Sequence, residues 1–243
     1  CWLLSRFPDV DQAARNPELV RSLDAFMAPP DIARRKREAN WHDMPNHARF
    51  VQASLLESDG DVHFRLRLIV LREFSRRFVE RQQEMIQHYV DRLLDKLLEQ
   101  SDIDFVADLA AHVPGHIIGN VLGVPDDHCP QLRVWSENVV QFFDVGRTDA
   151  HKALAERATT EFYEYLKDLI ALRERKPAND LISTFVAARQ AGELNETELI
   201  STCMLLLMAG HGSTIDVLGT GMWSLLNNPG QWQRLQNEPG LIH

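Results

Sequence analysis

The sequence predicts a mainly α-helical protein with a small β-sheet on its N-terminal side, and three observations support this fold class. Apolar residues recur at spacings of three and four through most of the stretch 62–100, which is the period of an amphipathic helix. A capping box at 195–198 opens a long apolar segment. The first residues are apolar and β-prone. Since no repeat or linker divides the 243 residues, we expect one domain over 1–243.

The N-terminal segment is expected to hold one strand followed by short helices. Trp2-Leu3-Leu4-Ser5 is short and apolar, which favours a strand. The turn that follows should lead into a helix over 9–15, with Asp9 as its N-cap. The stretch 31–59 is polar and mixed, which indicates loops and short helices.

The middle of the chain predicts a series of helices with recognisable breaks between them. The stretch 62–100 should contain two helices divided near Ser75. A further helix over 104–122 should end at Gly123-Val124-Pro125, because glycine followed by proline stops a helix. Three more helices are expected, over 131–145, 149–175 and 181–190.

The clearest predicted element is a long helix over 196–226. Asn195 should be its N-cap and Glu198 should complete the capping box. A helix of about 30 residues would be about 45 Å long. Its centre, Met204 to Ala209, is apolar on all sides, so we expect it to be buried and to cross the middle of the domain.

Composition narrows the classes of partner and the compartment. A net charge of −9 argues against wholesale binding of nucleic acid or an anionic membrane. The longest apolar run, Cys203 to Ala209, is far shorter than the about 20 residues of a membrane span. Cys1, Cys129 and Cys203 are far apart and odd in number, which favours a reducing cytoplasm over a disulfide framework or a zinc site.

The segment Ala209-Gly210-His211-Gly212-Ser213-Thr214 is unusual for the centre of a buried helix. Each glycine costs about 0.5–1 kcal/mol relative to alanine, and each buried polar group needs a partner. Two interpretations stand at this point. The glycines serve close packing between helices, or something else approaches the helix backbone here.

Several segments resemble, in the same order, parts of the bacterial cytochromes P-450. Residues 198–211 resemble the long central helix of that family, where an apolar stretch leads into Ala-Gly-x-(Asp/Glu)-Thr-Thr above the heme. Residues 223–235 and 179–194 resemble the segments on either side of it. Residues 59–67 resemble the family's Asp-Pro-Pro-x-His-x-x-x-Arg helix. Two further segments, 2–10 and 104–125, resemble an early strand with its helix and the middle helix.

This resemblance implies a heme-thiolate monooxygenase that uses heme b and hydroxylates an apolar small molecule such as a terpenoid, steroid or fatty acid. Ala209, Gly210 and Ser213 would then face the heme. His63 and Arg67 lie at i and i+4, so they share a helix face and by resemblance bind the heme propionates. The alternative for this pair is a solvated basic face.

The resemblance also implies partners. The electron donor would be a ferredoxin or a flavodoxin-type protein, steered to a locally basic surface; the alternative for that surface is ordinary solvated charge. The basic residues are Arg65, Arg72, Arg76, Arg77 and Arg81. Candidate substrate contacts are the loop Trp41–Phe50 and the helix residues Met204 and Leu205. We expect a cytoplasmic monomer that binds neither nucleic acid nor membrane.

The sequence departs from the family pattern at the acid–alcohol pair and at the heme ligand. Gly212 and Ser213 stand where the family has an acid and a threonine. Ser213, Thr214 and His211 are therefore the candidates for supplying protons, His211 because its ordinary pKa is near neutral. A peroxide-driven or atypical reaction becomes an alternative. The family's axial cysteine is expected beyond His243, so the chain looks incomplete at both ends, and an inactive heme-free helical fragment is the remaining alternative.

Overall fold

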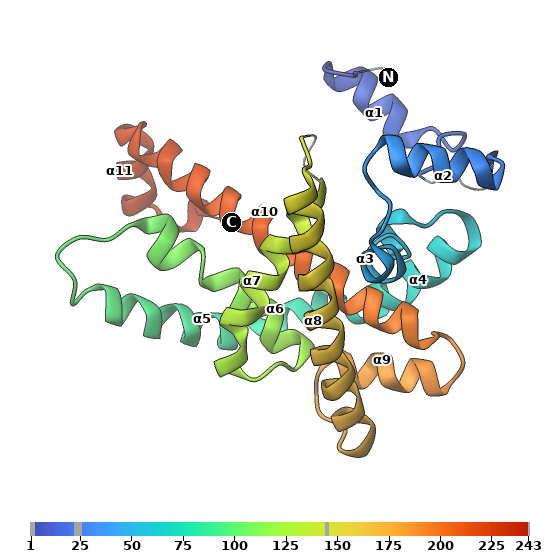
Figure 1. The fold of residues 1–243 in the computed structure, drawn as a ribbon. Helices are drawn as coiled ribbons and strands as arrows, with labels where there is room; N and C mark the ends of the chain where they lie inside the picture. Colours follow the sequence, from blue (N-terminus) through green and yellow to red (C-terminus); the bar gives the residue numbers. More distant parts are fainter. Residues whose placement is uncertain (1–2, 22–25, 144–145, 243) are drawn as a thin grey trace.

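A computed structural model describes residues 3–21, 26–143 and 146–242, and these ranges are almost entirely helical (Figure 1). The α-helices are α1 Phe7–Arg15, α2 Pro29–Glu38, α3 Pro45–Phe50, α4 Gly60–Glu73, α5 Arg76–Leu97, α6 Val113–Leu122, α7 Cys129–Val140, α8 Asp149–Arg175, α9 Leu181–Gln190, α10 Glu196–Leu226 and α11 Pro229–Asn237. Short 3₁₀ turns connect several of them, and a π-helix covers Phe105–Ala110.

The predicted N-terminal strand and small β-sheet are wrong for the part of the chain that the structure describes. Leu3, Leu4 and Ser5 form no strand, and Leu3 is 92% exposed. A strand needs a neighbour to satisfy its backbone groups, and no described segment pairs with these residues. Trp2 lies outside the described residues.

The first helix begins earlier than predicted. It starts at Phe7, and Pro8 occupies its first turn, where a missing N–H costs nothing. Asp9 is therefore inside the helix and not its N-cap. Its carboxylate accepts a hydrogen bond from Arg6 Nε at 2.7 Å.

Side-chain caps explain why several helices begin where the sequence predicts. Ser75 Oγ accepts from the N–H of Phe78, which starts α5 after the predicted break. Asp180 accepts from the N–H of Ser183 at the start of α9. At α10, Asn195 and Glu198 form the reciprocal capping box. The predicted spans of α8, α9 and α10 are confirmed.

The predicted helix over 104–122 is divided in two. The π-helix ends at Ala110 and α6 starts only at Val113. Pro114 occupies the first turn of α6, because a proline cannot donate the backbone hydrogen bond that a continuous helix requires. Gly123 then ends α6 in the left-handed conformation, with φ of 94°, as its residue type allows.

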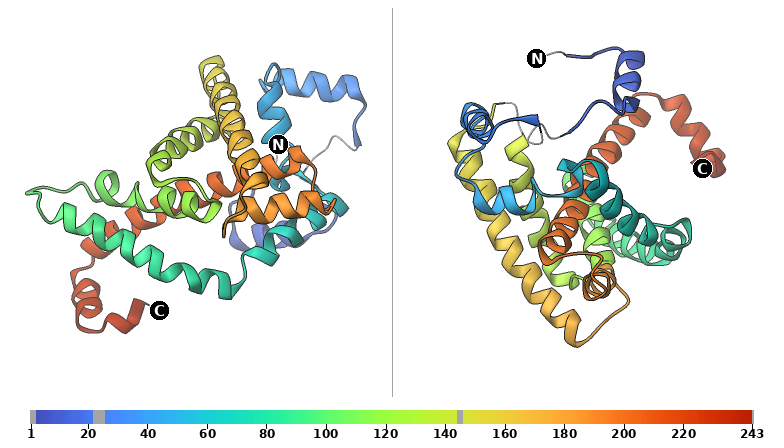
Figure 2. Two further views of the ribbon diagram at one scale, coloured as in Figure 1. Left: turned by 90° about the horizontal axis from the view of Figure 1, so that it is seen from below. Right: turned by 90° about the vertical axis from the view of Figure 1, so that its right-hand side faces the viewer.

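The long helix α10 runs through the middle of the molecule, where it contacts α3, α6, α7, α8 and α9 (Figure 1). Its first half is core: Leu199, Ile200, Cys203 and Leu207 are at most 1% exposed. Its second half, from Ala209 onward, is mostly exposed, so the prediction of a buried helix is wrong for this half. That half projects from the body toward α11 (Figure 2).

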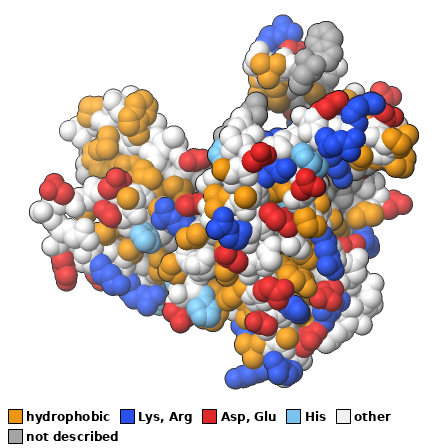
Figure 3. Space-filling model, viewed as in Figure 1, with side chains coloured by type: hydrophobic (Ala, Val, Ile, Leu, Met, Phe, Trp, Pro, Cys, Tyr) orange, Lys and Arg blue, Asp and Glu red, His pale blue; other side chains and the backbone are white. Residues whose placement is uncertain are grey.

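Exposed apolar side chains gather on this projecting end (Figure 3). Val217, Trp223 and Leu226 are each at least 66% exposed. By length and composition, Glu196–Leu226 and Phe105–Leu122 also resemble membrane spans, but 39% and 50% of these windows are buried inside the fold. Core helices of this kind pass the same test, so the finding is weak evidence for a membrane.

Candidate functional site

An open face of small residues lies where the exposed half of α10 begins. Ala209, Gly212, Ser213 and Asp216 recur at spacings of three and four, and all four are exposed. A Cβ built at Gly212 would meet nothing within 4 Å. This face of the helix backbone is therefore free to receive a flat group at close range.

The opposite face of the same turn is tightly packed against α6. A Cβ at Gly210 would stand 3.3 Å from Ile118 Cγ1. His211 is 1% exposed and lies against Gly115. Gly210 therefore serves helix packing, which confirms the first interpretation for that residue. Gly212 leaves the other face open, and the approach of another group to the backbone there stays a prediction.

The two hydroxyls of the segment are exposed and bonded to their own helix. Ser213 Oγ donates to the carbonyl of Ala209 at 3.0 Å, and Thr214 Oγ1 donates to that of Gly210 at 3.5 Å. Such bonds to the carbonyl four residues back hold the hydroxyl against the helix. Each oxygen keeps its acceptor lone pairs available to a ligand or a water.

His211 lies on the packed side, away from Ser213. Neither ring nitrogen has a hydrogen-bond partner among the described residues. Burial lowers the pKa of His211, so the ring is neutral near pH 7. The structure therefore separates this candidate from the open face of α10.

His63 and Arg67 lie on α4 and are not joined by any hydrogen bond or ion pair to 209–214 among the described residues. His63 Nδ1 donates to the carbonyl of Leu55 at 3.1 Å, so Nε2 is the ring's remaining nitrogen. Arg67 is exposed and forms no ion pair with any residue that the structure describes. Its guanidinium is thus available to a carboxylate from outside the chain.

The neighbouring Arg65 has a different role that sequence reasoning missed. Its Nη2 bonds Glu198 Oε1 at 2.5 Å, and its Nη1 also donates to the carbonyl of Glu193. This hydrogen bond holds the pKa of Glu198 below its ordinary value. The pair ties α4 to the start of α10.

The substrate contacts predicted by position divide between core and accessible residues: Met44, His47, Phe50 and Met204 are buried, and the others keep accessible surface. Phe50 is 1% exposed and stacks on Tyr163, with 4.6 Å between ring centroids. Met204 is also 1% exposed. Leu205 is half-buried, so it is the one of these three with accessible surface.

The two described cysteines are poor ligands for iron. Burial raises the pKa of Cys203 to about 12 and that of Cys129 to about 11. Each is therefore a neutral thiol near pH 7, whereas metals bind the thiolate. Cys1 lies outside the described residues.

The fold is helical around a long central helix that has an open face of small residues. Residues 29–240 match the family model Cytochrome P450. The chain belongs to the cytochrome P450 family.

Individual relatives agree with this assignment. Cytochrome P450 107B1 of Saccharopolyspora erythraea is 33% identical, over 99% of this chain and 57% of that protein. The crystal structure of myxobacterial cytochrome P450 CYP267B1 in complex with myristic acid superimposes with a TM-score of 0.86 at 30% identity, over 98% of this chain and 57% of that one. P450BioI in complex with hexadec-9Z-enoic acid ligated acyl carrier protein gives 0.78 at 29% identity, over 82% and 52%. The chain thus spans a little over half the length of these relatives.

Members of this family use heme, and the residues present here fit that group. Gly212 leaves open space over α10, which suits close contact with a porphyrin. Arg67, a guanidinium without an ion pair among the described residues, suits a propionate.

Sequence reasoning missed Gly115, which lets the ring of His211 pack against α6. A glycine inside a predicted helix was the available signal.

Proposed function

We propose that this chain is part of a monooxygenase that binds heme b over the open face of α10 and hydroxylates an apolar small molecule. When bound, heme supplies the reduction of dioxygen by two electrons and the transfer of one oxygen atom to a C–H bond, with two protons taken up and water released. The observation that carries the proposal is the open face itself, formed by Ala209, Gly212 and Ser213.

His63 and Arg67 would bind the two heme propionates. They occupy one face of α4, and the guanidinium of Arg67 is a donor that no described residue uses. His63 keeps Nε2, which donates to a propionate when both ring nitrogens are protonated. A guanidinium can bind a carboxylate through two parallel hydrogen bonds. Ala209 and Gly210 would support the porphyrin from α10, Gly210 by fixing the helix on Ile118.

Ser213 and Thr214 would hold the proton-donating water beside the reacting oxygen. The family's acid is replaced by Gly212, so another group would have to supply the protons. Asp216 is the one carboxylate on α10 beyond its first turn, it is exposed, and it lies one turn after Ser213. We therefore add Asp216 to the proton path. His211 would have a structural role: its buried ring packs against Gly115 of α6 and so fixes the turn of α10 that carries Ser213.

The substrate would be a molecule with a long apolar body, and a fatty acid is favoured over a terpenoid or a steroid. Two structural relatives were solved with myristic acid and with a hexadecenoyl acyl carrier protein. Leu205 lies one turn before Ala209 and is half-buried, so it keeps accessible surface beside the open face. A free acid and an acid carried on a protein are both compatible with this substrate class.

The electron donor would be an acidic ferredoxin or a flavodoxin-type protein that binds at the start of α5. The predicted basic surface is partly neutralised, since Arg65, Arg72 and Arg76 pair with Glu198, Glu193 and Glu80. Arg77 and Arg81 form no ion pair among the described residues. These two would carry most of the steering. We further propose one domain over 1–243, a monomeric protein and a cytoplasmic location.

A peroxide-driven reaction is the second candidate. Gly212 and Ser213 in place of the acid and the threonine favour it, because peroxide brings both oxygen atoms already reduced and needs no electron donor. A third outcome is that the chain alone is a heme-free helical fragment.

The experiment is a carbon monoxide difference spectrum of the reduced, full-length protein, with His63→Ala/Arg67→Ala as the variant and Arg175→Ala as an exposed arginine control. A thiolate-type Soret band that is lost in the double variant and kept in the control is the expected result. Heme retention unchanged in the double variant would refute the propionate assignment, and a wild-type protein without heme would refute the monooxygenase. Turnover with peroxide, and none with ferredoxin and NAD(P)H, would select the second candidate.

A further inference from the structure

The segment Ala39–His47, called the strap below, packs on the first half of α8 and has a small core of its own. This core consists of Met44, Phe142 and Ala155, with Trp41 packed against them, and it is separate from the main core. Before the strap, α2 has no buried residue. After it, Phe50 joins the main core and stacks on Tyr163. The strap can therefore move off α8 while the centre of the molecule stays folded.

Arg147, just before α8, fastens the start of the strap. Its Nη1 donates to the carbonyl of Ala39 at 2.5 Å, and its Nε donates to the carbonyl of Phe142 at 2.9 Å. The guanidinium also lies over the ring of Trp41, 5.1 Å from the centroid, where a cation is attracted by the ring. One side chain thus joins backbone groups of two segments that are far apart in the sequence.

Polar contacts to α8 complete the attachment. The carboxylate of Glu156 accepts from the N–H groups of Asn46 and His47, at 3.0 and 2.9 Å. The side chain of Asn40 donates to Asp149 at 3.2 Å. An open hollow of about 380 Å³ runs beside these contacts and is lined by Asp43, Asp149, Lys152, Ala153, Glu156 and Arg157. The contact between the strap and α8 is therefore polar and reached by solvent from one side.

The ring of His47 is enclosed beneath this contact. It is 0% exposed and lies edge-on to Phe142, with 4.3 Å between ring centroids. Neither ring nitrogen has a hydrogen-bond partner among the described residues. Of the charged groups nearby, Arg147 is a cation, the Glu156 carboxylate binds backbone N–H groups, and the others line the hollow. A proton on this ring would thus be a buried charge without a partner.

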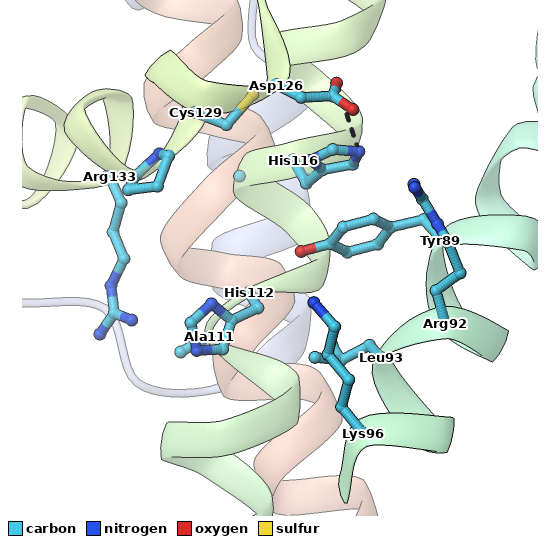
Figure 4. Close-up of a pocket in the computed structure, with 12 residues that line it drawn as sticks. Tyr89, Arg92, Leu93, Lys96, Ala111, His112, His116, Asp126, Cys129 and Arg133 are labelled. Carbon is cyan, nitrogen blue, oxygen red and sulfur yellow. Dashed lines mark ion pairs between the residues drawn. The ribbon is translucent and has the colours of Figure 1, made fainter.

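His116 shows the contrasting case of a buried histidine with an anion beside it (Figure 4). Its ring is 8% exposed and stacks on that of Tyr89, with 3.6 Å between centroids. Its Nε2 lies 3.7 Å from a carboxylate oxygen of Asp126, which favours the charged form of the ring. His47 has no such anion at its ring in the part of the chain that the structure describes. It must therefore leave its site before it can be protonated.

We propose that the strap is an acid-sensitive device, which is released from α8 when His47 takes up a proton. In the released strap the ring is in water, where histidine titrates near pH 6.5. In the docked strap, burial and the nearby Arg147 lower the pKa of His47 to about 4. Between these two values only the released strap binds the proton, so docking weakens as the pH falls. Release exposes Phe142 and Ala155, which the docked strap covers.

The experiment is amide hydrogen exchange of the full-length protein at pH 7 and pH 5, expressed as protection factors to remove the effect of pH on the chemical rate. The probes are the amides of Asn46, His47 and Ala48, whose hydrogen bonds to Glu156 and to the carbonyl of Met44 require the docked strap. Their protection should fall by about twentyfold from pH 7 to pH 5. Protection that does not change with pH overturns the proposal.

Urea distinguishes release of the strap from unfolding of the whole protein. At up to about 1 M urea, exchange in the strap should stay constant, because local opening exposes little surface. Exchange in α9, which belongs to the main core, should accelerate with urea. Equal urea dependence in the strap and in α9 would overturn the proposal, since the strap would then open only with the rest of the fold.

Two pairs of variants identify the residues responsible. In His47→Leu the change of protection with pH should shrink to within about twofold, whereas His88→Leu, at an exposed position of α5, should keep it. Arg147→Gln should lower strap protection at least about tenfold already at pH 7, and Arg175→Gln, at the other end of α8, should not. An undiminished effect of pH in His47→Leu would overturn the role of His47. A thermal melt checks that each variant folds, and the wild-type measurements remain decisive if one does not. None of these results depends on the proposed monooxygenase activity.

Discussion

Gly115 of α6 lies directly against the imidazole of His211 on α10, so that a Cβ at Gly115 would stand 3.3 Å from His211 Cδ2. The contact closes the packed side of the turn that exposes Ser213 on its other side. Both nitrogens of His211 are buried without a partner in the described chain. A buried polar group in this situation is costly.

Replacing His211 by leucine should therefore stabilise the protein. The change removes two unpartnered nitrogens and keeps most of the apolar volume, so we expect a gain of about 1 kcal/mol in the free energy of unfolding. Urea denaturation of the heme-loaded protein measures it. His211→Asn, which keeps buried polar atoms in a smaller side chain, is the control and should destabilise. A clear loss of stability in His211→Leu would mean that the imidazole has a partner beyond the described residues.

Gly123→Ala should be one of the most destabilising single substitutions in the chain. Gly123 has φ of 94°, and an added Cβ would collide with the carboxylate of Asp180, which also bonds Arg173 Nε at 2.5 Å. We expect a loss of about 3 kcal/mol or more. Gly192→Ala is a matched control, because φ is 79° there but the space is open; about 1 kcal/mol is expected. Equal losses for the two variants would exclude the collision as the cause.

Asp216→Asn should uncouple electron consumption from product formation. We propose that Asp216 replaces the missing acid at position 212. A positioned general acid accelerates a reaction by about 10²–10⁴-fold. Loss of the Asp216 carboxylate should therefore lower the fraction of NADH that yields product by about tenfold or more. Hydrogen peroxide release and product yield are the measurements. Restoring the family acid with Gly212→Glu in the Asp216→Asn background should recover coupling. Unchanged coupling in Asp216→Asn would assign proton supply to bulk water.

Stability should decrease in mild acid because of His47. The ring is fully buried, and both of its nitrogens lack a partner in the described structure. Burial, with Arg147 nearby, lowers the pKa of His47 to about 4. Between about pH 6.5 and 4 the unfolded chain binds a proton that the folded chain does not, so stability falls as pH falls. This lowering of the pKa corresponds to a loss of about 3 kcal/mol in the free energy of unfolding. The loss is complete below about pH 4.

The control for that effect is His47→Leu, which has no titrating group at this position. Its free energy of unfolding should depend less steeply on pH than that of the wild type across this window. Chemical denaturation at intervals of half a pH unit would show the difference. Parallel curves for the two proteins would mean that the folded state accepts the proton at His47.

Much of the helical fold could be predicted from short-range signals. Asn195 and Glu198 mark the start of α10 because a capping box is a local interaction, and Ser75 marks α5 in the same way. The strand predicted over 2–5 is wrong for the described residues 3–5, because a strand depends on a distant partner that local sequence does not reveal. The helix predicted over 104–122 is a π-helix followed by α6, and Pro114 in the first turn of α6 is the sequence signal for that division.

The site was predictable as a set of residues but not as two faces. The sequence shows that Ala209 to Thr214 is unusual, yet only the packing of α6 reveals that His211 turns away from Ser213. Arg65 and Arg67 look equivalent in sequence. Tertiary structure separates them, since Glu198 binds Arg65 and leaves Arg67 without an ion pair in the described chain.

The division of α10 into a buried half and an exposed half has a consequence for how this protein can change. Buried residues of the core, such as Leu199 and Leu207, precede Gly210, whereas the exposed residues Gly212, Ser213 and Asp216 follow it. A substitution at one of these exposed residues adds no clash with the core. The residues at these three positions can therefore change during evolution without loss of the fold. A combinatorial library at the same positions should consist mostly of folded proteins.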